Sequence, residues 1–251
     1  MVRIKREARL HAPAVDGAGG GAGGGAGLAE GDVGGPSAEE LARREERRLA
    51  RKARRRASRR EALLDSAREV IIDEGLAFTM DKVAAGADVS KPALYYYFRS
   101  KEALIGALAV EVLRVEAETL GRVIVDAESG LEALAASVRA KIELYRRDPD
   151  AFRILYLWAP MLGVSEGVRR SEMLPLQEVV THALEAKLIR DRERGRIDRG
   201  ADPHRLAMIA WTSAQGILSL VLGAGDPGAS PHSLDELCEE ACRILLRATA
   251  A

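Results

Sequence analysis

Cysteine is almost absent from this chain of 251 residues, which contains only Cys238 and Cys242. Two cysteines cannot form the disulfide framework of a small secreted protein, so the composition favours the reducing cytoplasm. Their spacing places both on one face of a helix, and no histidine stands nearby at the spacing of a zinc site. We therefore expect two small core side chains. No metal site, cofactor or catalytic residue is predicted.

Long uninterrupted apolar segments and a secretory leader are also missing. Residues 1–10 are charged and lack the apolar core of a signal peptide. The uncharged stretch 206–225 approaches the length of a membrane span, but Thr212, Ser213, Gln215 and Ser219 interrupt it. We expect this stretch to be a helix buried in protein at a subunit interface, and no membrane partner.

The formal net charge of +0 conceals an uneven distribution. Between Leu41 and Arg60 the chain has eleven Lys or Arg against two Asp or Glu, and the residues after Arg60 are acidic overall. A basic segment ahead of an acidic body favours an anionic partner such as nucleic acid. Taken alone, the basic segment could also be a solvated charged helix.

Strand-forming patterns are missing, because no run of β-branched residues alternates with polar ones. Leu, Ala, Arg and Glu dominate beyond Ala38, which predicts an all-α chain. Glycine and proline breaks place the helices at about 39–74, 80–86, 91–97, 101–126, 131–146, 149–162, 171–193, 203–222 and 234–248. Upstream, Gly17 to Gly27 is nearly all Gly and Ala, typical of a flexible tail.

Residues 63–104 carry the pattern of a helix-turn-helix. Leu63, Ala67 and Ile71 give the first helix an apolar stripe, and Gly75 ends it. Thr79 and Ser90 are good N-caps for two short helices, the second with Pro92 in its first turn. Two short helices joined by a tight turn place the second in the DNA major groove.

The helix at 91–97 should have an exposed apolar face. At about 100° per residue, Leu94 and Phe98 point to the core and Tyr96 points away from it. Such a face is costly unless a partner covers it, either DNA or a neighbouring domain. Lys101 stands in the first turn after Ser100, where a cation opposes the helix dipole unless a phosphate binds there.

The run from Thr79 to Leu104 resembles the DNA-binding domain of the TetR/AcrR family. It has the opening Thr, the Val-Ser before the third helix, Leu-Tyr-x-x-Phe and Ser-Lys-Glu-x-Leu, but Asp88 stands where that family usually has Gly. The resemblance implies base contacts by Ala93 and Tyr96 and phosphate contacts by Tyr95, Lys101 and Thr79. The full set of implied DNA contacts is Thr79, Lys91, Pro92, Ala93, Tyr95, Tyr96 and Lys101.

The same resemblance implies a ligand-released repressor that binds a palindromic operator as a homodimer. The chain would divide into a tail (1–37), a basic helical arm (38–57), a helix-turn-helix domain (58–104) and a helical ligand-binding and dimerisation domain (105–251). Helices 203–222 and 234–248 would dimerise, with small residues Ala207, Ala210, Ala214 and Gly216 allowing close approach.

An effector pocket is expected where aromatic residues gather in the body. Mostly apolar walls with a few polar groups describe a small-molecule site. The same residues at helical spacing could be ordinary core. The candidates are Phe152, Tyr156, Trp158, Met161 and Trp211, with His182 and Gln215 as polar groups.

Two other functional classes are considered. Residues 163–167 match the G-x-S-x-G pattern of serine hydrolases, but that motif needs a preceding strand, and the pattern here is helical. A helical adaptor could use the tyrosine face to bind a protein, and a DNA shift assay would separate it from a regulator. We predict no enzymatic activity.

Overall fold

A computed structural model describes residues 37–223 and 232–248. The predicted flexible tail therefore lies, apart from Ser37, outside the described residues. The chain divides after Ala50 into two units. In the first unit the described residues 38–50 are helical and exposed. The second unit starts at Arg51 and contains every other described element.

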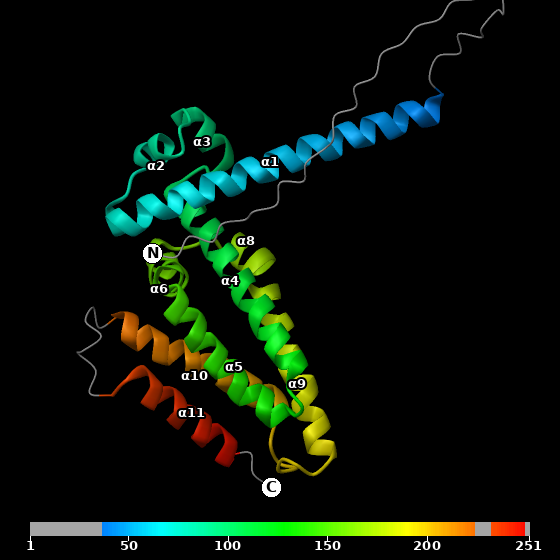
Figure 1. The fold of residues 1–251 in the computed structure, drawn as a ribbon, viewed down its shortest axis with the longest axis vertical. Coiled ribbons are helices and arrows are strands. Elements are labelled where there is room, and N and C mark those ends of the chain that lie inside the picture. The colour runs from blue at the N-terminus through cyan, green and yellow to red at the C-terminus, as the bar shows by residue number, and fades with distance from the viewer. Residues whose placement is uncertain (1–36, 224–231, 249–251) are drawn as a thin grey trace, which may run out of the picture. The chain divides into compact units, whose positions relative to one another are not determined.

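Every regular element of the described ranges is a helix, which confirms the all-α prediction (Figure 1). Gly75 ends the first long helix with a φ of +58°, as expected. The elements are α1 (Ala38–Glu74), η1 (Gly75–Ala77), α2 (Met80–Gly86), α3 (Lys91–Tyr97), α4 (Lys101–Asp126), α5 (Gly130–Arg147), α6 (Pro149–Arg153), η2 (Ile154–Trp158), α7 (Ala159–Leu162), α8 (Glu166–Val168), η3 (Arg169–Met173), α9 (Leu174–Glu193), α10 (Pro203–Gly223) and α11 (Leu234–Ala248).

Two hydrophobic clusters hold the second unit together. One joins α1, α2, α3 and the first half of α4, together with Ile154 and Leu155 of η2 and Ala159 of α7. The other lies between the second half of α4 and helices α5, α9, α10 and α11, which run side by side in Figure 1. Tyr156 and Trp211 pack against both clusters. Helix α4 and these two side chains therefore connect the helix-turn-helix to the rest of the unit.

Two π-helical turns interrupt helices that the sequence predicted to be regular. The turn η2 ends two residues before Pro160, and η3 ends two residues before Pro175. A proline lacks the N–H that would bond to the carbonyl four residues back, and its ring crowds that carbonyl. The widened turns accommodate both prolines without ending the helical run. The run leading into α9 begins at Glu166, five residues before the predicted start at 171.

The alanines of helix α10 pack within their own chain, whereas the sequence predicted that they would allow close approach of a second subunit. Ala207, Ala210 and Ala214 are buried inside their own chain against α5 and α9, whereas Gly216 is exposed. The small alanines therefore allow close packing within the protomer. No helix in the described ranges is long and apolar enough to cross a membrane. Cys238 and Cys242 are buried in the core, as predicted.

The start of α5 is fixed by a close backbone crossing with α9. The Gly130 N–H donates to Asp191 Oδ2 at 2.7 Å, and the Leu131 N–H donates to the same oxygen at 3.1 Å. Asp191 is buried, and its charge is balanced by Arg196 at 3.3 Å. A Cβ on Gly130 would lie 2.8 Å from the backbone N of Leu188. The position therefore requires glycine.

Substituting Gly130 by alanine is expected to destabilise the protein. The added methyl must push the α5 and α9 backbones apart, which costs about 2 kcal/mol of unfolding free energy. Gly121→Ala in α4 is the control, because no atom lies within 4 Å of the added Cβ and the change raises helix propensity. Urea unfolding of both variants measures the difference. Equal free energies of unfolding for Gly130→Ala and Gly121→Ala would contradict the close approach of α5 and α9 at Gly130.

Candidate functional site

Hydroxyl side chains start the helices of the helix-turn-helix, as the sequence predicted. The Thr79 hydroxyl accepts a hydrogen bond from the Lys82 backbone N–H at 3.3 Å. The Ser90 hydroxyl accepts one from the Ala93 N–H at 3.4 Å, and Ser100 caps α4 in the same way. Each cap satisfies one N–H that has no partner within the first helical turn. The caps fix where α2, α3 and α4 begin.

The turn between α2 and α3 keeps its shape without the usual glycine. Asp88 adopts a φ of +50°, the only positive φ of a non-glycine residue in the described part of the chain. Aspartate enters this left-handed region more readily than most residues because its short side chain bonds locally. The Val89 N–H then closes the turn on the Ala84 carbonyl at 3.0 Å.

Helix α3 has the two faces that its sequence predicted. Leu94 and Phe98 are buried, whereas Tyr96 keeps 65% of its surface exposed. Tyr95 and Pro92 are also exposed, and Ala93 and Tyr97 are half-buried. The exposed face is thus a patch of apolar and aromatic surface with hydroxyl groups at its edge. This composition suits a partner that offers both apolar groups and hydrogen-bonding edges.

Helix α1 adds positive charge beside this face. The Arg56 guanidinium lies 5.2 Å from the centroid of the Tyr96 ring. Such cation–π contacts are favourable within about 6 Å. Sequence reasoning assigned Arg56 only to the basic segment. The contact joins positions 40 residues apart, so no local pattern indicates it.

Both lysines that were predicted as DNA contacts already have partners within the chain. Lys91 Nζ lies 2.7 Å from Asp81 Oδ1, and this hydrogen-bonded carboxylate raises the pKa of Lys91. Lys101 Nζ donates to the Leu76 carbonyl and lies 4.3 Å from the centroid of the Phe78 ring. The carbonyl and the ring stabilise the Lys101 ammonium, for which the sequence indicated no partner within the chain.

Three of the predicted effector-pocket residues come together in the body. The rings of Phe152 and Tyr156 are 5.5 Å apart. The ammonium group of Lys141 lies 4.7 Å from the centroid of the Tyr156 ring and 4.0 Å from the centroid of the Trp211 ring. Of the other four candidates, Trp158 packs against the cluster that holds α1 to α3, as Tyr156 and Trp211 also do, Met161 and His182 are exposed, and Gln215 is half-buried.

Sequence reasoning missed a buried ion pair at the centre of this group. Lys141 Nζ lies 2.9 Å from Glu116 Oε1, and each residue is only 1% exposed. The Tyr156 hydroxyl donates to the same carboxylate, at 2.7 and 2.9 Å from its two oxygens. The available signal was a lysine between Val138 and Ile142, on the apolar face of its helix.

Burial changes the acid–base properties of this cluster. Desolvation lowers the pKa of Lys141, and the Glu116 carboxylate opposes that effect. Desolvation, followed by the same negative charge, raises the pKa of Tyr156 well above its ordinary value. Tyr156 is therefore a neutral hydrogen-bond donor. Lys141 is the group most easily discharged by a change in its surroundings.

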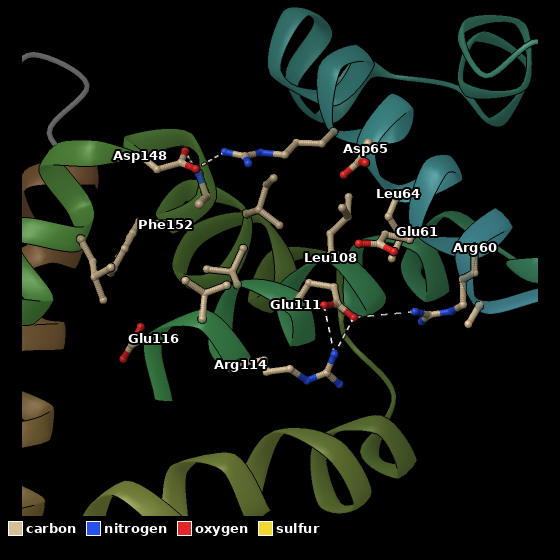
Figure 2. A pocket seen from close by; sticks show the side chains of 17 residues that line it. Arg60, Glu61, Leu64, Asp65, Leu108, Glu111, Arg114, Glu116, Asp148 and Phe152 are labelled. Atoms are coloured by element: carbon tan, nitrogen blue, oxygen red, sulfur yellow. Dashed lines mark hydrogen bonds and ion pairs between the residues drawn. The ribbon is translucent and has the colours of Figure 1, made fainter. Parts of the chain in front are cut away.

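A cleft of about 560 Å³ opens on the other side of Glu116. It is bounded by Leu64 of α1, Leu108 of α4 and Phe152 of α6, and Glu116 lies in its wall (Figure 2). Sites for small molecules in proteins occupy roughly 300–1,000 Å³. The cleft is large enough for a small organic ligand.

Ion pairs connect α1 to the body across this cleft. Arg68 donates to Asp148, which also caps α6 by accepting the Ala151 N–H at 3.0 Å. Arg60 lies 3.9 Å from Glu111 of α4 (Figure 2). The helix that supports the tyrosine face is thus tied to the segment that carries Phe152 and Tyr156.

A sequence model of the bacterial regulatory proteins of the tetR family matches residues 63–108. Solved structures share the fold along about three quarters of the chain. A transcriptional regulator of the TetR/AcrR family from Thermobifida fusca is 24% identical, with a TM-score of 0.59 over 75% of this chain and 97% of that one. FadR from Bacillus subtilis, in complex with stearoyl-CoA, is 18% identical, with a TM-score of 0.61 over 75% and 98%. AibR, in complex with isovaleryl coenzyme A and operator DNA, is 20% identical, with a TM-score of 0.57 over 76% and 99%.

No curated protein matches the chain in sequence. The similarity to the solved structures is therefore one of fold. The sequence match lies in the helix-turn-helix, and the caps, the turn and the two faces of α3 are consistent with that match. Residues 63–108 therefore form a DNA-binding domain of the type found in the tetR family of bacterial regulatory proteins, and the chain shares its fold with solved structures of regulators of that family.

Proposed function

We propose that the protein is a ligand-released repressor that binds a palindromic operator as a homodimer. The observation that carries the proposal is α3, a helix with a buried Leu94–Phe98 face and an exposed face around Tyr96. A short helix held in this way by a preceding helix can enter the DNA major groove. The basic residues of α1 lie ahead of it in the chain and supply charge for the phosphates.

Each exposed residue of α3 has a role in this proposal. Pro92 and Ala93 are flat or small enough to approach thymine methyl groups, and the Tyr96 hydroxyl reaches a base edge. Tyr95 and Thr79 contact phosphates. Lys91 and Lys101 contact phosphates after exchanging their present partners, Asp81 and the Leu76 carbonyl.

Dimerisation would cover apolar surface that one chain leaves exposed on α10 and α11. Met208, Ile209 and Leu220 are exposed on α10, and Ile244 is exposed on α11. A second copy related by a two-fold axis would bury this surface. The two copies of α3 would then lie roughly one DNA turn apart, which requires a palindromic operator.

The effector is proposed to bind in the body, at the cleft beside Glu116. The FadR structure is a complex with stearoyl-CoA, and the AibR structure is a complex with isovaleryl coenzyme A and operator DNA. These relatives support regulation by a small molecule in a shared fold. In this chain, Phe152, Tyr156 and Trp211 are the aromatic residues beside the cleft and the buried pair.

Genome-wide capture of bound DNA tests the proposal. Recovery of a palindromic sequence upstream of a small set of genes is the expected result. A shift assay on the recovered sequence distinguishes a regulator from a helical adaptor that binds protein through the tyrosine face. Capture of no palindromic site would overturn the proposal.

Tyr96→Ala is expected to weaken binding to the operator by about 10- to 100-fold. Non-specific DNA should change little, because phosphate contacts supply most of that affinity. Tyr96→Phe keeps the ring and removes the hydroxyl, so it separates hydrogen bonding from apolar contact. Fluorescence anisotropy on operator and scrambled duplexes measures both affinities. An equal loss on both duplexes would show that Tyr96 does not read bases.

A further inference from the structure

The ammonium of Lys141 occupies a site that is built to hold a cation. The Glu116 carboxylate lies 2.9 Å from Nζ, and the rings of Tyr156 and Trp211 lie 4.7 and 4.0 Å from it. A carboxylate combined with aromatic faces is also how proteins bind ammonium groups of ligands. Here a side chain of the protein itself takes the place of such a ligand.

Fold stability gives no strong reason for this arrangement. Replacing a buried ion pair by apolar residues of similar volume is often neutral or stabilising. Lys141 also lacks a well-aligned hydrogen-bond acceptor within the described residues, although Glu116 is close. The space beside Nζ is about 20 Å³, enough for about one water molecule. Glu116, which pairs with this buried lysine, also lines the cleft, and a buried charge pair that borders a cleft is a candidate functional site.

The cleft on the opposite side of Glu116 carries an excess of negative charge. Five carboxylates and three guanidinium groups line it. Glu111 and Asp148 are paired with the arginines, whereas Glu61 and Asp65 form no ion pair with any described residue. The remaining wall is apolar, including Phe152. A ligand that crosses this cleft toward Glu116 meets a lining that favours positive charge and apolar bulk.

We propose that Glu116, with the rings of Tyr156 and Phe152, forms a cation site and that the effector is an apolar organic cation that displaces the Lys141 ammonium from Glu116. This inference rests on the proposed function for its regulatory meaning, but the binding itself does not. The ligand charge replaces the lysine charge at the carboxylate. The apolar groups of the ligand fill the cleft between α1, α4 and α6.

Displacement has a consequence for protons. A second positive charge beside Lys141 and the loss of its carboxylate partner add to desolvation, and both lower its pKa further. The proton on Nζ then leaves to the solvent, and the neutral amine stays in the small space that Lys141 lines together with Ser137 and Thr181. The other groups around Nζ are Glu116 of α4, Tyr156 of η2, which stays neutral, and Trp211 of α10. Binding that releases a proton strengthens as the pH rises.

Tetraphenylphosphonium and tetraphenylborate are the probes, because they share size and shape and differ in the sign of charge. The full chain should bind the phosphonium at least about tenfold more tightly than the borate. Trp211 lies beside the site, so tryptophan fluorescence reports binding. Calorimetry in buffers of different ionisation enthalpy should show proton release with the phosphonium.

Two variants locate the preference at the buried pair. The double variant Glu116→Gln, Lys141→Met carries no charge at the site and should lose the preference for the cation. The matched control is Glu143→Gln, Arg147→Met, which removes an exposed ion pair from the same helix and should keep it. In Lys141→Met alone, the phosphonium should raise the melting temperature more than in the unmodified protein, because it supplies the missing counter-charge.

The outcomes separate this inference from the proposed function. Equal affinity for the two probes, tighter binding of the borate, or a preference that survives in the double variant would overturn the cation site. Operator binding, measured independently in a shift assay, tests the regulator. If the phosphonium binds as expected but does not release the operator, the cation site stands and ligand-released repression fails.

Discussion

Lys141→Met is expected to lower the free energy of unfolding by about 3–5 kcal/mol, the largest effect of any single substitution considered. The methionine keeps the length and most of the volume of the lysine. What it removes is the counter-charge of Glu116, which is only 1% exposed and would be left as an unpaired buried charge. For a chain of this size the melting temperature should fall by roughly 10 °C. Glu116→Gln should have a similar effect, because it leaves the ammonium unpaired.

A double-mutant cycle identifies the cause. The double variant Glu116→Gln, Lys141→Met should recover most of the loss, since neither charge is left uncompensated. The exposed pair Glu143 and Arg147 on α5 is the control, and its removal should cost less than about 1 kcal/mol. Denaturant unfolding followed by circular dichroism measures all the variants. If the decreases in unfolding free energy of the two single variants simply add in the double variant, the pair does not stabilise the fold through its charge.

Removing the residues before Arg56 is expected to have the largest effect on DNA binding. The segment 43–55 contains eight Lys or Arg and two Glu. Each phosphate contact adds about 0.9 to the slope of log affinity against log salt concentration. If half of the basic residues make such contacts, the slope should fall by about 3 to 4, and affinity at low salt by about 100-fold or more.

Two further variants assign this loss to charge. Deleting only residues 1–37, which contain four basic and four acidic residues, should leave the slope unchanged. Replacing the arginines of 43–55 by glutamine keeps the chain length and should reproduce the deletion. The measurement is operator affinity at several salt concentrations. An unchanged slope in both variants would mean that the segment is a solvated helix.

Local chemistry made much of the helix-turn-helix predictable. Caps act on N–H groups three residues away, so Thr79 and Ser90 reveal the helix starts directly in the sequence. The buried and exposed faces of α3 follow from the helical repeat alone. The positive φ of Asp88 agrees with its place in the sequence, where the family usually has Gly, and with the readiness of aspartate to adopt the left-handed region.

Contacts between distant segments set the limits of sequence reasoning. Glu116 and Lys141 lie on different helices, and each alone resembles an ordinary charged residue that happens to fall in an apolar stripe. Likewise, the hydrogen bond that Lys101 donates to the Leu76 carbonyl joins α4 to η1. The aromatic residues of the body were grouped by composition, and only the fold shows that Tyr156 and Trp211 share the ammonium of Lys141.

The shared packing of Tyr156 has a thermodynamic consequence. Its ring contacts both hydrophobic clusters, and its hydroxyl is fixed on Glu116. A ligand that moves Glu116 therefore alters the packing beneath the helix-turn-helix as well as that of the body. Linkage is reciprocal, so if an effector weakens operator binding by some factor, the operator must weaken effector binding by the same factor. Operator-bound protein would then respond only at a higher effector concentration than free protein does.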